Sequence, residues 1–340
     1  MQKTKKQNTV NSLIFLNNLK RFEINSFHKV LMEVLQIDES AVYRRTSGET
    51  SITFNETLLL LKHYKKDLNA LIPYLDHQVQ FTYKPINAVS YTYDDFLKDI
   101  VCKLQSLVKE GIKHCFYFAK EHPLFYNLMF APMGLFKYYV WEKSFLSGDI
   151  FEKQKFSLNK IAASTNREDS LLLANLYLQF DTEELWGHET INITIQQIEH
   201  YYLSDYFESK TDALAICKSL KELLQHIQLQ VEYGFKVDPA TQLPTQAKYH
   251  LYVSELTSGD NKIVITSTRD ELIVFDSSNT LQYQESTNEM YCSSIKKSIQ
   301  KMSKKAMLLN NLDDKEKNKF FTRHHKIIDM LILKIETNNF

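Results

Sequence analysis

The scarcity of glycine and proline is the feature that most constrains the fold, because only 7 Gly and 6 Pro occur among 340 residues. Both residues mark turns and relieve tight backbone geometry, so their scarcity favours long helices with few connections. The glycines are also too far apart for a loop that cradles phosphate. Since no other catalytic motif occurs, we expect a mainly α protein that is not an enzyme.

The cysteines and the short apolar segments indicate a cytoplasmic protein. The four cysteines lie far apart, without the paired spacing of a zinc or redox site. Residues 13–16 are apolar but form too short a segment for export. No segment approaches the roughly 18 apolar residues of a membrane span. We expect no metal, no cofactor and no membrane partner.

The start of the chain has the apolar spacing of a helical bundle. Helices are expected at residues 10–22, 27–36, 39–46 and 54–66, with a short fifth at 68–72. Asp38 is a good N-cap for the third helix, and Gly48 can take the left-handed conformation that ends it. Thr53 and Glu56 have the spacing of a capping box. These signals predict one domain of four or five helices at residues 1–75.

The rest of the chain predicts a larger, mostly helical domain at residues 94–340, joined by a linker at 76–93. Helices are expected at residues 94–119, 129–146, 155–164, 168–180, 189–203, 209–233, 289–303 and 314–337. Alternating polar and apolar residues predict a small antiparallel sheet at about 247–285.

Residues 28–48, HKVLMEVLQIDESAVYRRTSG, have the pattern of two helices that cross over a tight turn. Such a crossing needs apolar contacts at fixed places, and these are Leu31, Leu35, Ile37 and Val42. The segment resembles the helix-turn-helix domain of phage-repressor and Cro-like regulators. The resemblance implies that residues 1–75 bind DNA and that the third helix enters the major groove.

A narrower resemblance covers more of the chain. Residues 41–49, AVYRRTSGE, followed by a Leu-rich helix, are similar to long Bacteroidetes-type regulators with a helical C-terminal region. The segments KEHPLF at 120–125 and FKYYVW at 136–141 also resemble that group. The segment departs from the Cro-like pattern at Met32, in the middle of the second helix where Ala is usual, and at Gln36, in the turn where Gly is usual. Gln36 removes the easiest route to a positive φ at the turn.

The exposed face of the predicted third helix provides candidate DNA contacts. The residues expected to contact base edges are Glu39, Ser40, Tyr43 and Arg44. Arg44 suits bidentate contact with guanine, and Glu39 can accept a hydrogen bond from cytosine. The residues expected to contact the DNA backbone are His28, Lys29, Arg45 and Ser47. Arg45 stands at a place that is commonly apolar in Cro-like domains.

Residues 116–145 are unusually rich in aromatic side chains. Six of them are candidates for the lining of an effector pocket: Phe116, Phe125, Tyr126, Phe136, Tyr139 and Trp141. The alternative, which we favour, is that they form the core where several helices meet.

The charge distribution fits a DNA-binding domain on a sensing or assembly domain. The first 80 residues contain 11 Lys and Arg against 8 Asp and Glu, although the whole chain has a net charge of zero. We expect a sequence-specific, dimeric transcriptional regulator. Its expected partners are double-stranded DNA, a second copy of the chain, and an unidentified small-molecule or protein effector. The alternative is a protein-interaction or structural module whose helix-turn-helix no longer binds DNA.

Overall fold

In a computed structural model, the chain divides into two compact units, unit 1 (Met1–Gln80) and unit 2 (Phe81–Phe340). The structure describes residues 12–20, 26–64, 66, 79–83, 91–111, 114–146, 153–165, 167–254, 261–267, 270–277 and 283–338. The predicted fifth helix at 68–72 and most of the predicted linker at 76–93 lie outside these ranges. The two units have separate hydrophobic cores.

Unit 1 is helical in its described part. Residues 12–20 are helical, and they are followed by α2 (Phe27–Leu35), α3 (Glu39–Thr46) and α4 (Phe54–His63). Apolar residues at helical spacing bury one side of each helix. The resulting core consists of Phe15, Leu16, Leu19, Phe27, Leu31, Leu35, Val42, Leu60 and Leu61, with Ile37 packed against it.

The predicted helix caps of unit 1 are confirmed. The Asp38 carboxylate accepts a hydrogen bond from the backbone N–H of Ala41 at 2.7 Å. Thr53 and Glu56 form a capping box at the start of α4. Gly48 follows α3 with a φ of 81°. Local sequence signals therefore set the ends of α3 and the start of α4.

Unit 2 is built around a mixed β-sheet, and the prediction of a small antiparallel sheet near the C-terminus is wrong. Among the described residues nine strands form one sheet: β1 (Thr82–Tyr83), β2 (His114–Ala119), β3 (Asp181–Gly187), β4 (Phe235–Val237), β5 (Pro244–Ser254), β6 (Lys262–Thr266), β7 (Leu272–Ser277), β8 (Tyr283–Ser286) and β9 (Met307–Leu308). The order across the sheet is β1-β8-β7-β6-β2-β3-β5-β4, and β9 pairs with β5. Strands β2, β3 and β5 are parallel neighbours, whereas the other pairs are antiparallel.

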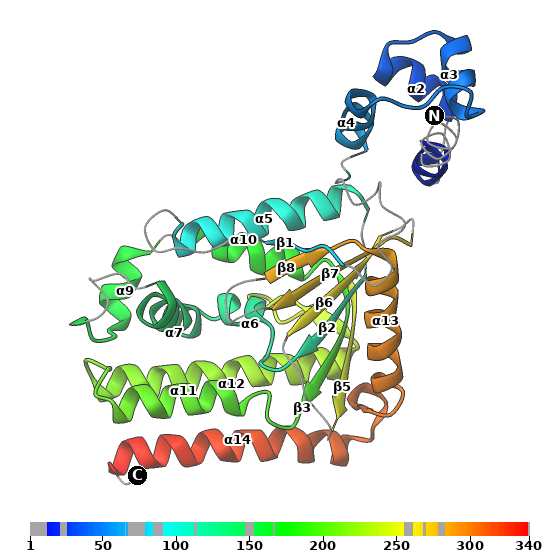
Figure 1. Cartoon of the computed structure of the whole chain (residues 1–340). Coiled ribbons are helices and arrows are strands. Elements are labelled where there is room, and N and C mark those ends of the chain that lie inside the picture. Colours follow the sequence, from blue (N-terminus) through cyan, green and yellow to red (C-terminus); the bar gives the residue numbers. More distant parts are fainter. Residues whose placement is uncertain are drawn as a thin grey trace. The chain divides into compact units, whose positions relative to one another are not determined.

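Helices pack on both faces of this sheet (Figure 1). Helix α13 (Glu289–Ser303) packs on one face. The other face meets the main core of unit 2, to which these helices contribute: α5 (Tyr93–Lys109), α6 (Leu124–Met129), α7 (Ala131–Trp141), α9 (Leu158–Ser164), α10 (Glu168–Tyr177), α11 (Asn192–Leu203), α12 (Lys210–Tyr233) and α14 (Asp314–Thr337). A π-helical turn, Glu142–Leu146, follows α7, and a 3-10 turn, Leu309–Asn311, follows β9. None of the helices in the described ranges is long and apolar enough to cross a membrane.

Strand β2 shows why the sheet was not predicted. The sequence predicts one helix over residues 94–119, but its last part is a strand in the middle of the sheet. Cys115 and Tyr117 pack into the main core, whereas Phe116 and Phe118 pack toward α13. A strand that is buried on both faces is continuously apolar, so it lacks the alternation that identifies a half-exposed strand.

Candidate nucleic-acid interface

Helix α3 combines one fully buried side chain with an exposed polar face. Val42 is 0% exposed, whereas Tyr43 is 62% exposed. The other predicted base contacts, Glu39, Ser40 and Arg44, are exposed as well. The spacing of these four residues places them on one side of the helix. This face therefore presents a guanidinium, a carboxylate and hydroxyl groups to the surroundings of unit 1.

The turn between α2 and α3 keeps a left-handed residue although it lacks the usual glycine. Gln36 has a φ of 53° and a ψ of 46°, and its backbone N–H donates to the Met32 carbonyl oxygen. A side chain in this conformation costs roughly 1–2 kcal/mol. The tight turn expected between α2 and α3 is thus present. Because Gln36 stands there in place of the usual glycine, the backbone of the turn is strained.

The guanidinium of Arg45 is engaged by partners within unit 1. Its Nη2 donates to Oε1 of Glu56 at 2.6 Å, and its Nη1 donates to the carbonyl oxygen of Ala41 at 3.1 Å. The two charged side chains are only 15% and 14% exposed. Burial raises the pKa of Glu56, but the hydrogen bonds and the charge of Arg45 outweigh it, so that the pKa is lowered. The guanidinium of Arg45 therefore joins α3 to the start of α4, a contact within unit 1 that the sequence did not predict.

Glu56, the partner of Arg45, was not predicted from the sequence as a contact of that residue. The second carboxylate oxygen, Oε2, accepts from the backbone N–H of Thr53 at 2.8 Å. Glu56 thus caps α4 and holds Arg45 at the same time. The capping-box spacing identified Glu56, but no local signal pairs it with a residue 11 positions earlier.

The other predicted backbone contacts are exposed. His28 and Lys29 lie in the first turn of α2, where the N-cap Ser26 makes no side-chain capping bond within the described residues. Ser47 donates its hydroxyl to the carbonyl oxygen of Arg44 at 3.3 Å. Ser40 donates its hydroxyl to Asp38 at 2.8 Å, so its oxygen remains able to accept a hydrogen bond.

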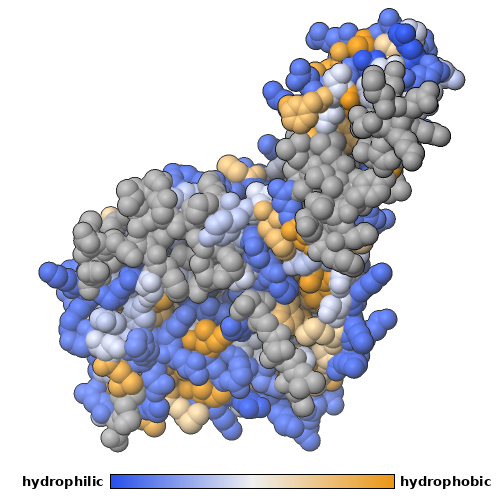
Figure 2. Space-filling model, in the orientation of Figure 1, coloured by the Kyte–Doolittle hydropathy of each residue, from blue (hydrophilic) through white to orange (hydrophobic). Residues whose placement is uncertain are grey.

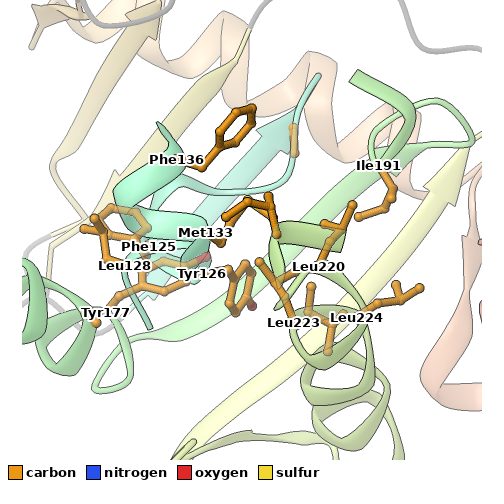
Figure 3. Close-up of a cluster of buried hydrophobic side chains, with 14 of the residues drawn as sticks. Phe125, Tyr126, Leu128, Met133, Phe136, Tyr177, Ile191, Leu220, Leu223 and Leu224 are labelled. Carbon is orange, nitrogen blue, oxygen red and sulfur yellow. The ribbon is translucent and has the colours of Figure 1, made fainter. Parts of the chain in front are cut away.

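The six aromatic residues suggested for an effector pocket are all buried and do not converge on one site. Figure 3 shows Phe125, Tyr126 and Phe136 packed among aliphatic side chains such as Leu223 of α12. Tyr139 and Trp141 belong to the same core. The remaining residue, Phe116, packs on the opposite face of the sheet. These positions agree with the alternative interpretation, in which the aromatic residues belong to the hydrophobic core.

Two hollows of unit 2 lie apart from these six aromatic residues. One is a cavity of about 20 Å³ between α5, α7 and α10, with Tyr93, Gly134 and Ser170 in its lining. Such a volume has room for about one water molecule. The other is a shallow depression on α13, and none of the six aromatic residues lines either hollow. In the part of the chain that the structure describes, no three His, Cys, Asp or Glu residues are placed to hold a metal ion.

A buried ion pair in unit 2 was not predicted from the sequence. Glu184 of β3 and Lys236 of β4 are both 0% exposed, with 3.4 Å between Oε1 and Nζ. The hydroxyls of Tyr126 and Tyr177 each donate to the same carboxylate oxygen at 2.7 Å. Burial lowers the pKa of Lys236 to about 8. The ion pair and these hydroxyls connect β3 and β4 with the surrounding tyrosines.

The exposed face of α3 is therefore the candidate site whose geometry matches a recognised mode of binding. Its interpretation depends on the helix-turn-helix pattern of residues 28–48 and on the exposure of its side chains. Comparisons of the chain with protein-family models, with curated proteins and with solved structures find no match.

Proposed function

We propose that this protein binds duplex DNA through the exposed face of α3 and acts as a transcriptional regulator. The observation that carries this proposal is the division of α3 between a buried Val42 and an exposed face of Glu39, Ser40, Tyr43 and Arg44. A recognition helix needs such a division, because one side must anchor it while the other enters the major groove.

The surroundings of α3 support the same proposal. Arg44 offers the fork of donors that suits O6 and N7 of guanine, and Glu39 offers an acceptor for the amino group of cytosine. His28 and Lys29 lie at the amino-terminal end of α2, where a helix dipole favours a phosphate. Arg45 and Glu56 fix α3 against α4, so the face is presented on a firmly held helix.

The test compares Arg44→Ala with Lys29→Ala in the full-length protein, on a duplex selected from a random-sequence library and on its single-base variants. Arg44→Ala should lose about 1–3 kcal/mol of discrimination at one base pair. Lys29→Ala should weaken all sequences alike and reduce the salt slope by about one. Equal losses on both duplexes for Arg44→Ala would place the base-contacting face elsewhere. A wild-type protein that binds no duplex would refute the proposal.

We further propose a cytoplasmic homodimer held by unit 2. One copy of unit 1 contacts few base pairs. Two copies that bind half-sites about one helical turn apart provide useful specificity. An effector, if unit 2 binds one, must have different affinities for two states of the protein. Light scattering that shows a monomer at micromolar concentration, with and without DNA, would contradict the dimer.

The exposed apolar residues of α4 favour a second candidate, a protein-interaction module. Phe54 is 67% exposed, and Leu58 and Leu59 are 41% and 47% exposed. Exposed apolar groups of this size often mark contacts between proteins. Phe54→Ser together with Leu58→Ser should leave DNA binding unchanged if α3 is the functional surface. Loss of a cellular phenotype in that variant, with DNA binding intact, would favour the second candidate.

A further inference from the structure

Helix α13 has a lysine-rich outer face that the proposed function does not use. Residues 290–312 contain five lysines and no Asp or Glu. Four of these lysines are exposed and share one side of the helix and its C-terminal turn: Lys297, Lys301, Lys304 and Lys305. We call these four residues the α13 lysine face. At 1.5 Å per residue they extend over roughly 12 Å.

Within the described residues, no ion pair involves any of the four ammonium groups of the α13 lysine face, and the nearest acidic residue on the helix is Glu289 in the first turn. Ser293 and Ser294 lie one turn before Lys297 and line a shallow depression with it and with Glu289. Ammonium groups beside hydroxyl donors form a surface that attracts and holds phosphate oxygens.

The opposite side of α13 is fixed to the sheet. Cys292 and Ile299 are buried there against Phe116, Val264 and other side chains of the sheet. Figure 2 shows hydrophilic side chains along the edge of unit 2 at which Figure 1 draws α13. A helix that inserts into a membrane surface needs its apolar side free, and this helix has already buried that side. The observations thus favour a rigid polyanion over a lipid bilayer.

The covalent connection to unit 1 starts beside this helix. Strand β1 pairs with β8, which directly precedes α13. The ring of Phe81, next to β1, contacts the ring of Tyr291 in the first turn of α13, with 5.2 Å between centroids. The chain thus joins the end of unit 2 that carries α13 to unit 1 through the residues that precede Thr82.

From these observations we propose that the α13 lysine face binds the phosphate backbone of the same DNA duplex that α3 reads. The inference rests on the proposed function of α3. A duplex carries one phosphate per about 3.4 Å on each strand, so four cations over about 12 Å match the phosphates of one strand. The lysines supply affinity and no sequence information, because backbone contacts are the same at every base pair.

The experiment compares three full-length proteins on the selected duplex and on a random-sequence duplex, between 50 and 200 mM salt. The test variant carries Gln at Lys297, Lys301, Lys304 and Lys305. The control removes the same charge from four exposed lysines on α5, α12 and α14: Lys98, Lys218, Lys315 and Lys326. The salt slope of the test variant should be smaller by about 3–4 units, because each phosphate contact contributes about 0.9. The preference for the selected duplex should be unchanged.

A rescue variant excludes a general loss of structure. Arg at all four positions keeps the charge and should restore the wild-type slope, which a purely structural effect of the lysines would not require. The inference fails if the test and control variants have equal slopes. It also fails if only binding to vesicles with anionic lipid depends on the four lysines. Wild-type binding with no sequence preference, lost on changing the lysines but not Arg44, would refute the role of α3 and retain that of α13.

Discussion

The ion pair between Arg45 and Glu56 yields the sharpest prediction for the stability of unit 1. Arg45→Ala removes two hydrogen bonds of the guanidinium, one to Glu56 and one to the carbonyl oxygen of Ala41. Glu56→Gln removes the charge from the pair but retains an amide oxygen that can cap Thr53, because Gln serves in a capping box as well as Glu. The two variants therefore separate the link to α3 from the cap of α4.

The expected loss follows from the geometry of the pair. Hydrogen bonds of charged groups contribute about 1.5–3 kcal/mol when buried. Exposure of 15% and 14% admits some solvent screening, so we expect Arg45→Ala to cost about 2 kcal/mol in total. For a unit of about 80 residues this lowers Tm by about 8–16 °C. Glu56→Gln should remove most of the same interaction. The double variant should therefore lose about 1–2 kcal/mol less than the sum of the two single variants, which is the coupling energy of the pair.

Thermal unfolding of the full-length protein, followed by calorimetry, measures these values in a double-mutant cycle. Arg44→Ala is the matched control, since it removes the same side chain from the exposed neighbouring position and should change the free energy of unfolding by less than about 0.5 kcal/mol. Additive losses for Arg45→Ala and Glu56→Gln would refute the link. So would a Tm for Arg45→Ala equal to that of Arg44→Ala.

Three further changes have expected outcomes. Gln36→Gly should raise the free energy of unfolding by roughly 1 kcal/mol in urea titrations, because it relieves a positive φ; a loss would show that the Gln36 side chain stabilises the turn. Burial, and then the charge of Lys236, lower the pKa of His226 to about 4. The free energy of unfolding that depends on neutral His226 should be fully present above pH 6.5 and should fall by about 3 kcal/mol as the pH falls toward 4. His226→Gln should remove this pH dependence, and an unchanged pH profile in that variant would contradict the assignment. Lys236→Met should destabilise unit 2 by about 3–5 kcal/mol, since it leaves the Glu184 carboxylate without its cation, and adding Glu184→Gln should recover part of this loss; a neutral Lys236→Met would be inconsistent with a buried charge pair.

The helices and caps of unit 1 could be predicted from the sequence because their signals are local. A cap such as Asp38 is recognised from its position before a helix, and a buried residue such as Val42 from apolar spacing. Helical spacing also predicted that Arg45 lies at the edge of the face that contacts DNA. Its true partner lies on another helix, and helical spacing says nothing about contacts between helices.

The sheet of unit 2 could not be predicted in the same way. Strands β2 and β3 become neighbours only through a connection of about sixty residues. The sequence of neither strand contains a local signal that predicts this pairing. Tyr126 shows the consequence for site residues. It belongs to a dense aromatic segment, but its hydroxyl donates to Glu184, which lies 58 residues away. A count of aromatic residues cannot distinguish such a hydrogen-bonded core from a pocket.

The pairing of β1 with β8 governs the order in which this protein can assemble during synthesis. Thr82 pairs with Glu285, so at about 5–20 residues per second the partner strand emerges about 10–40 s after the first. For part of that interval the edges of β2 are open, because its neighbours β3 and β6 begin only at Asp181 and Lys262. The buried residues of the described core of unit 1, by contrast, have all been synthesised by Leu61. A ribosome that stops before β8 would therefore release a chain with a complete α3 surface and an aggregation-prone body.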